Sequence, residues 1–75
     1  MEVEVMTRHY MGRLLIEQAE KKQNLFYVSA DNGFVGRVRV LRKQDHLKWF
    51  SPDITDKELL EQIGEWIEYT YEFKA

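Results

Sequence analysis

Hydrophobic and polar residues alternate in the middle of the chain, which predicts β-strands there. Residues 35 to 41 read VGRVRVL, and residues 25 to 30 (LFYVSA) are rich in residue types that favour strands. The letters DNG between these stretches are typical of a short hairpin turn. A third, shorter strand is predicted over residues 46 to 50, before the Ser-Pro pair. The pattern therefore predicts a three-stranded antiparallel meander.

A C-terminal helix is the clearest single element. Thr55 and Glu58 have the spacing of a capping box, which predicts that the helix starts there. The apolar residues that follow fall in one arc of about 140° when placed on a helix. This expected core face comprises Leu59, Leu60, Ile63, Trp66, Ile67, Thr70 and Tyr71. Glutamates on the opposite side are typical of a solvated helix back: Glu58, Glu61, Glu65, Glu68 and Glu72.

The first third of the chain allows two interpretations. Residues 2 to 5 (EVEV) alternate and predict a short strand. Residues 8 to 22 are expected to form a helix, because their apolar residues recur with the helical i, i+3, i+4, i+7 spacing. The alternative takes residues 10 to 19 as a further strand, since the apolar run LLI has no clear period and Gly12 weakens a helix.

These elements predict one α+β domain over residues 1 to 75, in the order β-α-β-β-β-α. The sheet is expected to be small and mostly antiparallel, with three to four strands. The C-terminal helix and the N-terminal helix are both expected on one of its faces. A chain of 75 residues has barely enough interior for one core, so a second domain is excluded.

The order predicted after residue 8 is similar to that of double-stranded-RNA-binding domains. In that family, the second helix begins with a lysine-rich stretch that contacts phosphates. The corresponding stretch here is SPDITDKELLEQ, in which Asp53, Asp56 and Glu58 stand against Lys57. The resemblance is limited to the order of elements, and the sequence does not predict membership of the family.

Charge is distributed unevenly, although the net charge is only −2. Residues 24 to 50 hold five Lys and Arg against two Asp, whereas residues 51 to 75 hold seven acids against two Lys. The protein is therefore expected to have a basic side and an acidic side. The chain has no cysteine, no run of apolar residues long enough for a membrane span and no signal-peptide pattern, so we expect a cytoplasmic protein.

Catalytic chemistry has little support in the sequence. His9 and His46 are the only histidines, and neither has metal-binding spacing. Asp53 and Asp56 are better explained by the dipole at a helix start than as an acid and base pair. We therefore expect no enzyme, no cofactor, no metal site and no small-molecule substrate.

One face of the predicted sheet is a candidate ligand-binding surface. If Val38 and Val40 point to the core, Arg37 and Arg39 point outward, because side chains alternate along a strand. The same alternation predicts an outer face that holds Tyr27, Arg37, Arg39, His46, Lys48 and Phe50. Such a face is typical of an ordinary solvated strand, but cations and rings on an open sheet also bind single-stranded nucleic acid.

The segment EVEV mirrors residues 37 to 40 (RVRV) with opposite charge. A central strand of a meander already has two neighbours, so the first strand can pair only at an edge. Its glutamates would then lie about 10 Å from the arginines, two strand spacings away. Direct pairing therefore requires a different strand order or a second molecule.

The C-terminal helix has a wider apolar surface than a monomer core requires. Trp66, Tyr69 and Phe73 extend its apolar coverage to about 200°, against roughly 100° for a typical surface helix. The N-terminal helix would cover these rings; otherwise they would contact a protein partner or a second copy of the chain. The sequence thus predicts a non-catalytic binding protein with a regulatory or accessory role. It would act through contacts with a partner protein or with a second copy of itself, as a homodimer. The alternative is a nucleic-acid-binding module that uses the outer sheet face.

Overall fold

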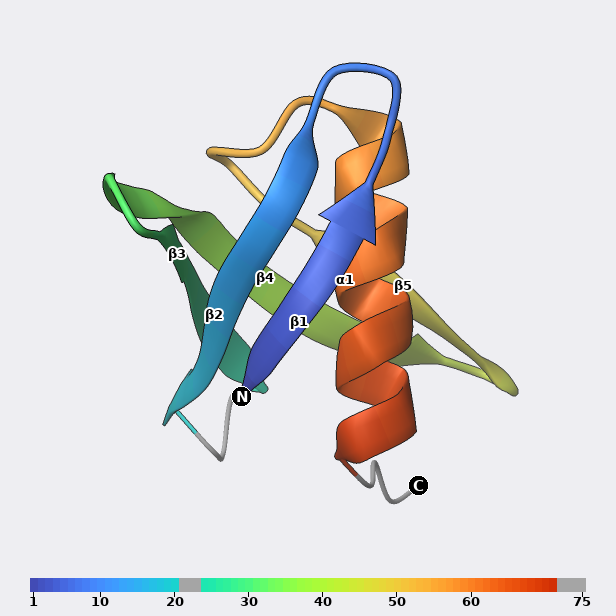
Figure 1. Ribbon diagram of the computed structural model, residues 1–75. Helices are drawn as coiled ribbons and strands as arrows, with labels where there is room; N and C mark the ends of the chain where they lie inside the picture. Colours follow the sequence, from blue (N-terminus) through green and yellow to red (C-terminus); the bar gives the residue numbers. More distant parts are fainter. Residues whose placement is uncertain (21–23, 72–75) are drawn as a thin grey trace.

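The computed structural model describes residues 1–20 and 24–71, which form a five-stranded sheet and one helix (Figure 1). Consecutive strands are hydrogen-bonded neighbours, and every pair is antiparallel, so the sheet is a simple meander. The elements are β1 (Glu2–Met6), β2 (Met11–Glu20), β3 (Leu25–Ala30), β4 (Gly33–Lys43), β5 (His46–Phe50) and α1 (Lys57–Thr70).

The predicted α+β class, the three central strands and the C-terminal helix are confirmed, but the predicted N-terminal helix over residues 8 to 22 is wrong. Residues 11 to 20 form β2, which pairs with β1 on one side and β3 on the other, and residues 21 and 22 lie outside the described part. Leu14 is 1% exposed and Leu15 is 37% exposed, which is the alternation of a strand. The sheet therefore has five strands rather than the predicted three to four, and the order of elements is not that of double-stranded-RNA-binding domains.

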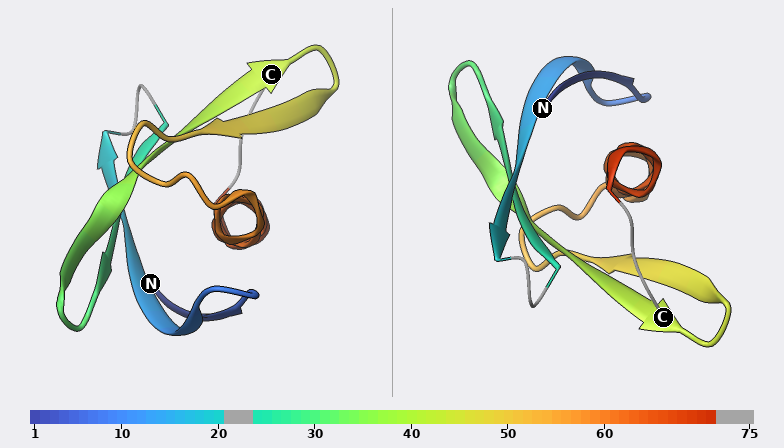
Figure 2. Two further views of the ribbon diagram at one scale, coloured as in Figure 1. Left: turned by 90° about the horizontal axis from the view of Figure 1, so that it is seen from above. Right: turned by 90° about the horizontal axis from the view of Figure 1, so that it is seen from below.

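The sheet curls around α1, which fills its concave side (Figure 2). The helix packs against β1, β4 and β5, and thus closes the space between the two edge strands. Because one face of each strand points to the helix, the buried residues form a single cluster. It comprises Val3, Val5, Leu14, Ile16, Phe26, Val28, Val38, Val40, Ile54, Leu59, Ile63 and Ile67.

Helix α1 begins one residue later than the capping box predicts. Asp56 is the N-cap, and its carboxylate accepts hydrogen bonds from the backbone N–H groups of Glu58 at 3.0 Å and Leu59 at 3.4 Å. Thr55 is exposed and lies before the cap. Within the described residues, no helix has the length and apolar character needed to cross a bilayer.

Gly64 is the point at which β5 packs against α1. A Cβ atom at this position would lie only 2.2 Å from Cδ2 of Trp49, so the indole ring rests on the bare helix backbone. The indole nitrogen of Trp49 is buried and has no hydrogen-bond partner in the described structure. The contact between β5 and the helix thus depends on the absence of a side chain at residue 64.

Candidate functional site

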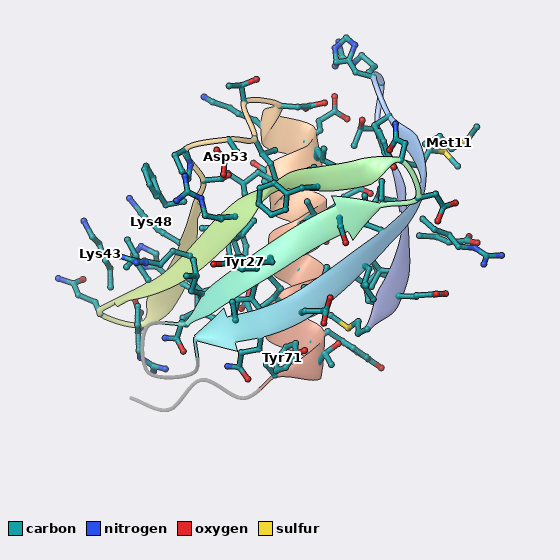
Figure 3. All side chains as sticks on the ribbon, turned by 90° about the vertical axis from the view of Figure 1, so that its left-hand side faces the viewer. Met11, Tyr27, Lys43, Lys48, Asp53 and Tyr71 are labelled. Carbon is teal, nitrogen blue, oxygen red and sulfur yellow. The ribbon has the colours of Figure 1, made fainter. Side chains whose placement is uncertain are left out.

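The outer sheet face is the convex face of β3, β4 and β5, and the six residues that the sequence assigned to it are exposed: Tyr27, Arg37, Arg39, His46, Lys48 and Phe50. Tyr27 lies opposite Arg37 across the β3–β4 pair, and Arg39 lies opposite Phe50 across the β4–β5 pair. Figure 3 looks toward this side, with Tyr27 on β3 and Lys43 and Lys48 at the β4–β5 hairpin. Helix α1 packs on the opposite face, which leaves the outer face open.

Phe34 also belongs to the outer sheet face, although strict alternation along β4 places it inward. A register shift between β3 and β4 pairs Val28 with Gly36 and then Ser29 with Phe34, so one residue of β4 is skipped. The Phe34 ring then meets the Tyr27 ring edge to face, with centroids 5.9 Å apart and planes at 89°. The bulge has no clear sequence signal other than the glycine at position 36.

Arg37 is held in place by Asp53 from the segment that joins β5 to α1. One carboxylate oxygen, Oδ2, accepts hydrogen bonds from Nε of Arg37 at 3.1 Å and from its backbone N–H at 3.0 Å. The side-chain hydrogen bond is the main cause that lowers the pKa of Asp53 and raises the pKa of Arg37. Asp53 therefore orients the arginine on the sheet face, a role that its interpretation as a helix-start residue did not anticipate.

Gly36 allows this pairing. A Cβ atom at Gly36 would lie 2.9 Å from Cβ of Asp53 and 2.9 Å from Cγ1 of Ile54. The segment that carries Asp53 thus packs directly on the backbone of β4, next to Arg37.

A small hollow lies beside this ion pair on the outer sheet face. It has a volume of about 190 Å³, and its described lining residues are Leu25, Arg37, Arg39, Phe50 and Pro52. Two guanidinium groups thus meet three apolar side chains. The volume is below the roughly 300–1,000 Å³ of sites for drug-sized ligands, so the hollow fits one small ring rather than a whole cofactor.

The glutamates of EVEV are paired on the other half of the sheet. Arg13 on β2 approaches Glu2 at 4.0 Å and Glu4 at 3.9 Å, and all three side chains are mostly exposed. Strand β1 is separated from β4 by β2 and β3, so EVEV and RVRV do not meet within one chain. Exposed ion pairs of this kind contribute at most about 1 kcal/mol to the stability of the fold. Because Arg13 is paired with two glutamates, β1 and β2 lack the basic character of β4 and β5.

A second surface, which we call the α1 surface, consists of Met6, Met11, Trp66 and Tyr69. Trp66 is 39% exposed and Tyr69 is 86% exposed. Their rings meet edge to face, with centroids 6.4 Å apart and planes at 83°. The predicted N-terminal helix, which was expected to cover these rings, is replaced in the structure by strand β2. Phe73, the third ring of the predicted set, lies outside the described residues.

Gln62 joins the helix to β1 in the middle of the α1 surface. Its Oε1 accepts a hydrogen bond from the backbone N–H of Met6 at 2.9 Å, and its Nε2 donates to the carbonyl oxygen of the same residue. Two shallow hollows meet at Gln62: one is lined by Trp66 and Tyr69, and the other by Met6 and Met11. The two rings on α1 and the two methionines on the β1–β2 hairpin therefore lie on either side of Gln62, each pair beside its own hollow.

The α1 surface has an acidic border. Glu65 lines one hollow, and Glu4 lines the other together with Arg13. The nearby cations are already paired with glutamates, because Arg8 lies 3.4 Å from Glu58 and Arg13 contacts the carboxylates of β1. The sequence pattern included Trp66 and Thr70 in the expected core face, but both are exposed, because only the narrower stripe of Leu59, Ile63 and Ile67 is buried. The pattern also missed Met11, which the helical interpretation assigned to a core position.

Nothing in the described structure resembles a metal centre, since no three His, Asp or Glu side chains among residues 1–20 and 24–71 are grouped to hold an ion. Comparison of the chain with protein-family models, with curated proteins and with solved structures gives no significant match. The two surfaces described above are therefore the basis for any functional proposal.

Proposed function

We propose that the protein is a non-catalytic accessory protein that binds a partner protein through the α1 surface. The partner segment is basic and carries apolar side chains. The observation that supports this proposal is the exposure of Trp66 and Tyr69 on α1 and of Met6 and Met11 on the β1–β2 hairpin, beside two hollows that share Gln62.

The apolar side chains of this surface are of the types that protein interfaces favour. Aromatic residues and methionine are enriched at interfaces, and single exposed apolar residues elsewhere need no explanation. Trp66 and Tyr69 offer two perpendicular ring faces, whereas the flexible side chains of Met6 and Met11 adapt to different shapes. Four exposed apolar side chains beside two hollows that share Gln62 support a docking role.

The acidic border supports a basic partner. Helix α1 carries four glutamates against one lysine, and Glu65 lies next to both rings. A lysine or arginine of the partner would contact a carboxylate and the face of Trp66 or Tyr69 together, which adds a cation–π interaction of about 0.5–2 kcal/mol. An acidic segment would be repelled by the same border.

A second copy of the chain is the competing occupant, because its β4–β5 hairpin is also basic. That contact would join two different surfaces, and repetition would produce rings or filaments. Sedimentation velocity from low to high micromolar concentration separates the two cases. We expect a monomer throughout; a dimer or larger species that Tyr69→Ala abolishes would contradict the choice of a separate partner.

Binding is tested directly with two synthetic peptides of about 14 residues: one alternates lysine and leucine, and its twin has glutamate in place of lysine. Fluorescence anisotropy of the labelled peptides should show binding of the lysine peptide alone. Tyr69→Ala should weaken it roughly 5- to 30-fold, corresponding to about 1–2 kcal/mol, as for a central interface ring. Phe50→Ala, which removes an exposed ring from the other surface, is the matched control and should bind as the wild type does. Equal binding of both peptides, or no effect of Tyr69→Ala, would refute the proposal.

A further inference from the structure

We propose that the outer sheet face binds single-stranded nucleic acid. One base occupies the hollow beside Phe50, and neighbouring phosphates contact Arg37, Arg39 and Lys48. This inference rests on the opposite face of the sheet from α1 and does not depend on the function proposed for the α1 surface.

The rings of this face are available for stacking. Phe50 is 56% exposed and forms one wall of the hollow, with Leu25 and Pro52 as further apolar contacts. Tyr27 and Phe34 form a second aromatic site on β3 and β4, on the same face. Stacking on aromatic side chains tolerates any base sequence, because every base has a π-face. Two aromatic sites on adjacent strands suit successive unpaired bases.

The volume of the hollow favours a base as the group that enters it. A hollow of about 190 Å³ with apolar walls and guanidinium groups at its border admits a flat ring whose charged substituents stay outside. A nucleotide has this form, since the base is planar and the phosphate is anionic. An acidic peptide supplies carboxylates but generally no ring to fill the hollow.

The cations are placed where phosphates would follow the chain of bases. Between residues 33 and 50 the sequence has five Lys and Arg against one Asp. Arg37 and Arg39 flank the hollow from adjacent outward positions of β4, and Lys48 extends the basic strip onto β5. The hydrogen bond that Nε of Arg37 donates to Asp53 holds the side chain in place, which reduces the conformational entropy that the arginine loses on binding.

The same features argue against a duplex as the ligand. Bases in a double helix are stacked and paired, so a ring such as Phe50 cannot reach their faces without opening the helix. A convex sheet face with exposed rings instead displays them to a strand whose bases are splayed out. The proposal is therefore specific for unpaired strands.

The experiment measures the affinity of labelled 12-nucleotide single strands, DNA and RNA, for the whole chain at several salt concentrations. With two to three phosphate contacts, the logarithm of the affinity should fall with a slope of about −1.4 to −2.1 against the logarithm of the salt concentration. Affinity should thus drop about 7- to 18-fold between 50 and 200 mM salt. Phe50→Ala should weaken binding about 5- to 150-fold, the range expected for the loss of one stacked base.

Two further variants separate charge from stacking. Arg39→Gln should lower the affinity and make the salt slope less steep by about 0.7, the value of one phosphate contact with a single strand. Tyr69→Ala, on the α1 surface, should leave strand binding unchanged. Circular dichroism and a thermal melt confirm that each variant is folded before its affinity is compared.

Polyphosphate, poly-glutamate and a matched duplex serve as competitors. We expect the unlabelled single strand to compete at least tenfold better than any of them. Equal competition by polyphosphate or poly-glutamate would show a simple charge effect and overturn the proposal. No binding at 50 mM salt, or an unchanged affinity for Phe50→Ala, would overturn it as well, and neither result would bear on the α1 surface.

Discussion

Substitution of Gly64 by alanine should destabilise the protein, although alanine is the better helix former. An alanine Cβ would lie between 2.2 and 2.5 Å from three atoms of the Trp49 ring, whereas carbon atoms in contact are normally about 3.5–4.0 Å apart. The indole ring must therefore move by more than about 1 Å, in a position where it is enclosed between β5 and α1.

The magnitude follows from two opposing effects. Overpacking costs typically about 1–3 kcal/mol, and the closeness of three ring atoms places this case near the upper value. The higher helix propensity of alanine offsets about 1 kcal/mol of this loss, because glycine is that much less favourable inside a helix. We expect a net loss of about 2 kcal/mol, which lowers the melting temperature by about 8–16 °C in a domain of this size.

A double-mutant cycle in urea tests the cause. In a Trp49→Leu background the clash is removed, so Gly64→Ala should become neutral or stabilising by up to about 1 kcal/mol. Glu61→Ala, at an exposed position of the same helix, is the control and should change stability by no more than about 0.5 kcal/mol. If Gly64→Ala stabilises the wild-type chain, the packing of Trp49 on the helix backbone is refuted.

Three further comparisons test the fold and the Asp53 ion pair by urea unfolding. Asp56→Ala should lower the free energy of unfolding by about 1 kcal/mol, because the helix loses its N-cap. Thr55→Ala should stay within about 0.5 kcal/mol of the wild type, and the reverse result would show that Thr55 is the N-cap, as the capping box predicts. Leu14→Ala should cost about 2–5 kcal/mol, and Leu15→Ala should cost far less because its side chain points outward; equal effects would argue against strand β2. The pKa of Asp53 is lowered from its ordinary value of 3.8 by the arginine, so the unfolded chain binds the proton more tightly. The stability that Asp53 contributes is therefore present above about pH 4 and is lost as the pH falls through the lowered pKa. The advantage of the wild type over Asp53→Asn should shrink between pH 5 and pH 2.5, and a constant difference would contradict this linkage.

The central strands and the C-terminal helix could be predicted because their periods are clear in the sequence. Along β4 the valines and arginines alternate without interruption, and the buried residues of α1 follow the helical period. Strand β2 could not be assigned in this way. Its apolar run LLI hides the alternation, and only pairing with β1 and β3 decides which leucine is buried.

The two surfaces were predictable to different extents. Alternation placed Tyr27, Arg37 and Phe50 on one face correctly, since neighbouring strands share the pleat. Phe34 was not assigned to this face, because it joins the face only through a bulge that has no reliable sequence signal. The role of Asp53 also required coordinates, since it depends on how closely the segment before α1 approaches Gly36.

The central claim is that the α1 surface docks a basic protein segment, and the two tryptophans of the chain allow its most direct test. Trp66 lies on this surface, whereas Trp49 is packed between β5 and α1. In an NMR titration with the lysine and leucine peptide, the indole N–H signal of Trp66 and the side-chain amide signals of Gln62 should shift. The indole signal of Trp49 should stay within the line width. Unchanged signals for Trp66 and Gln62 at a saturating peptide concentration, or equal shifts with the glutamate twin, would contradict the claim.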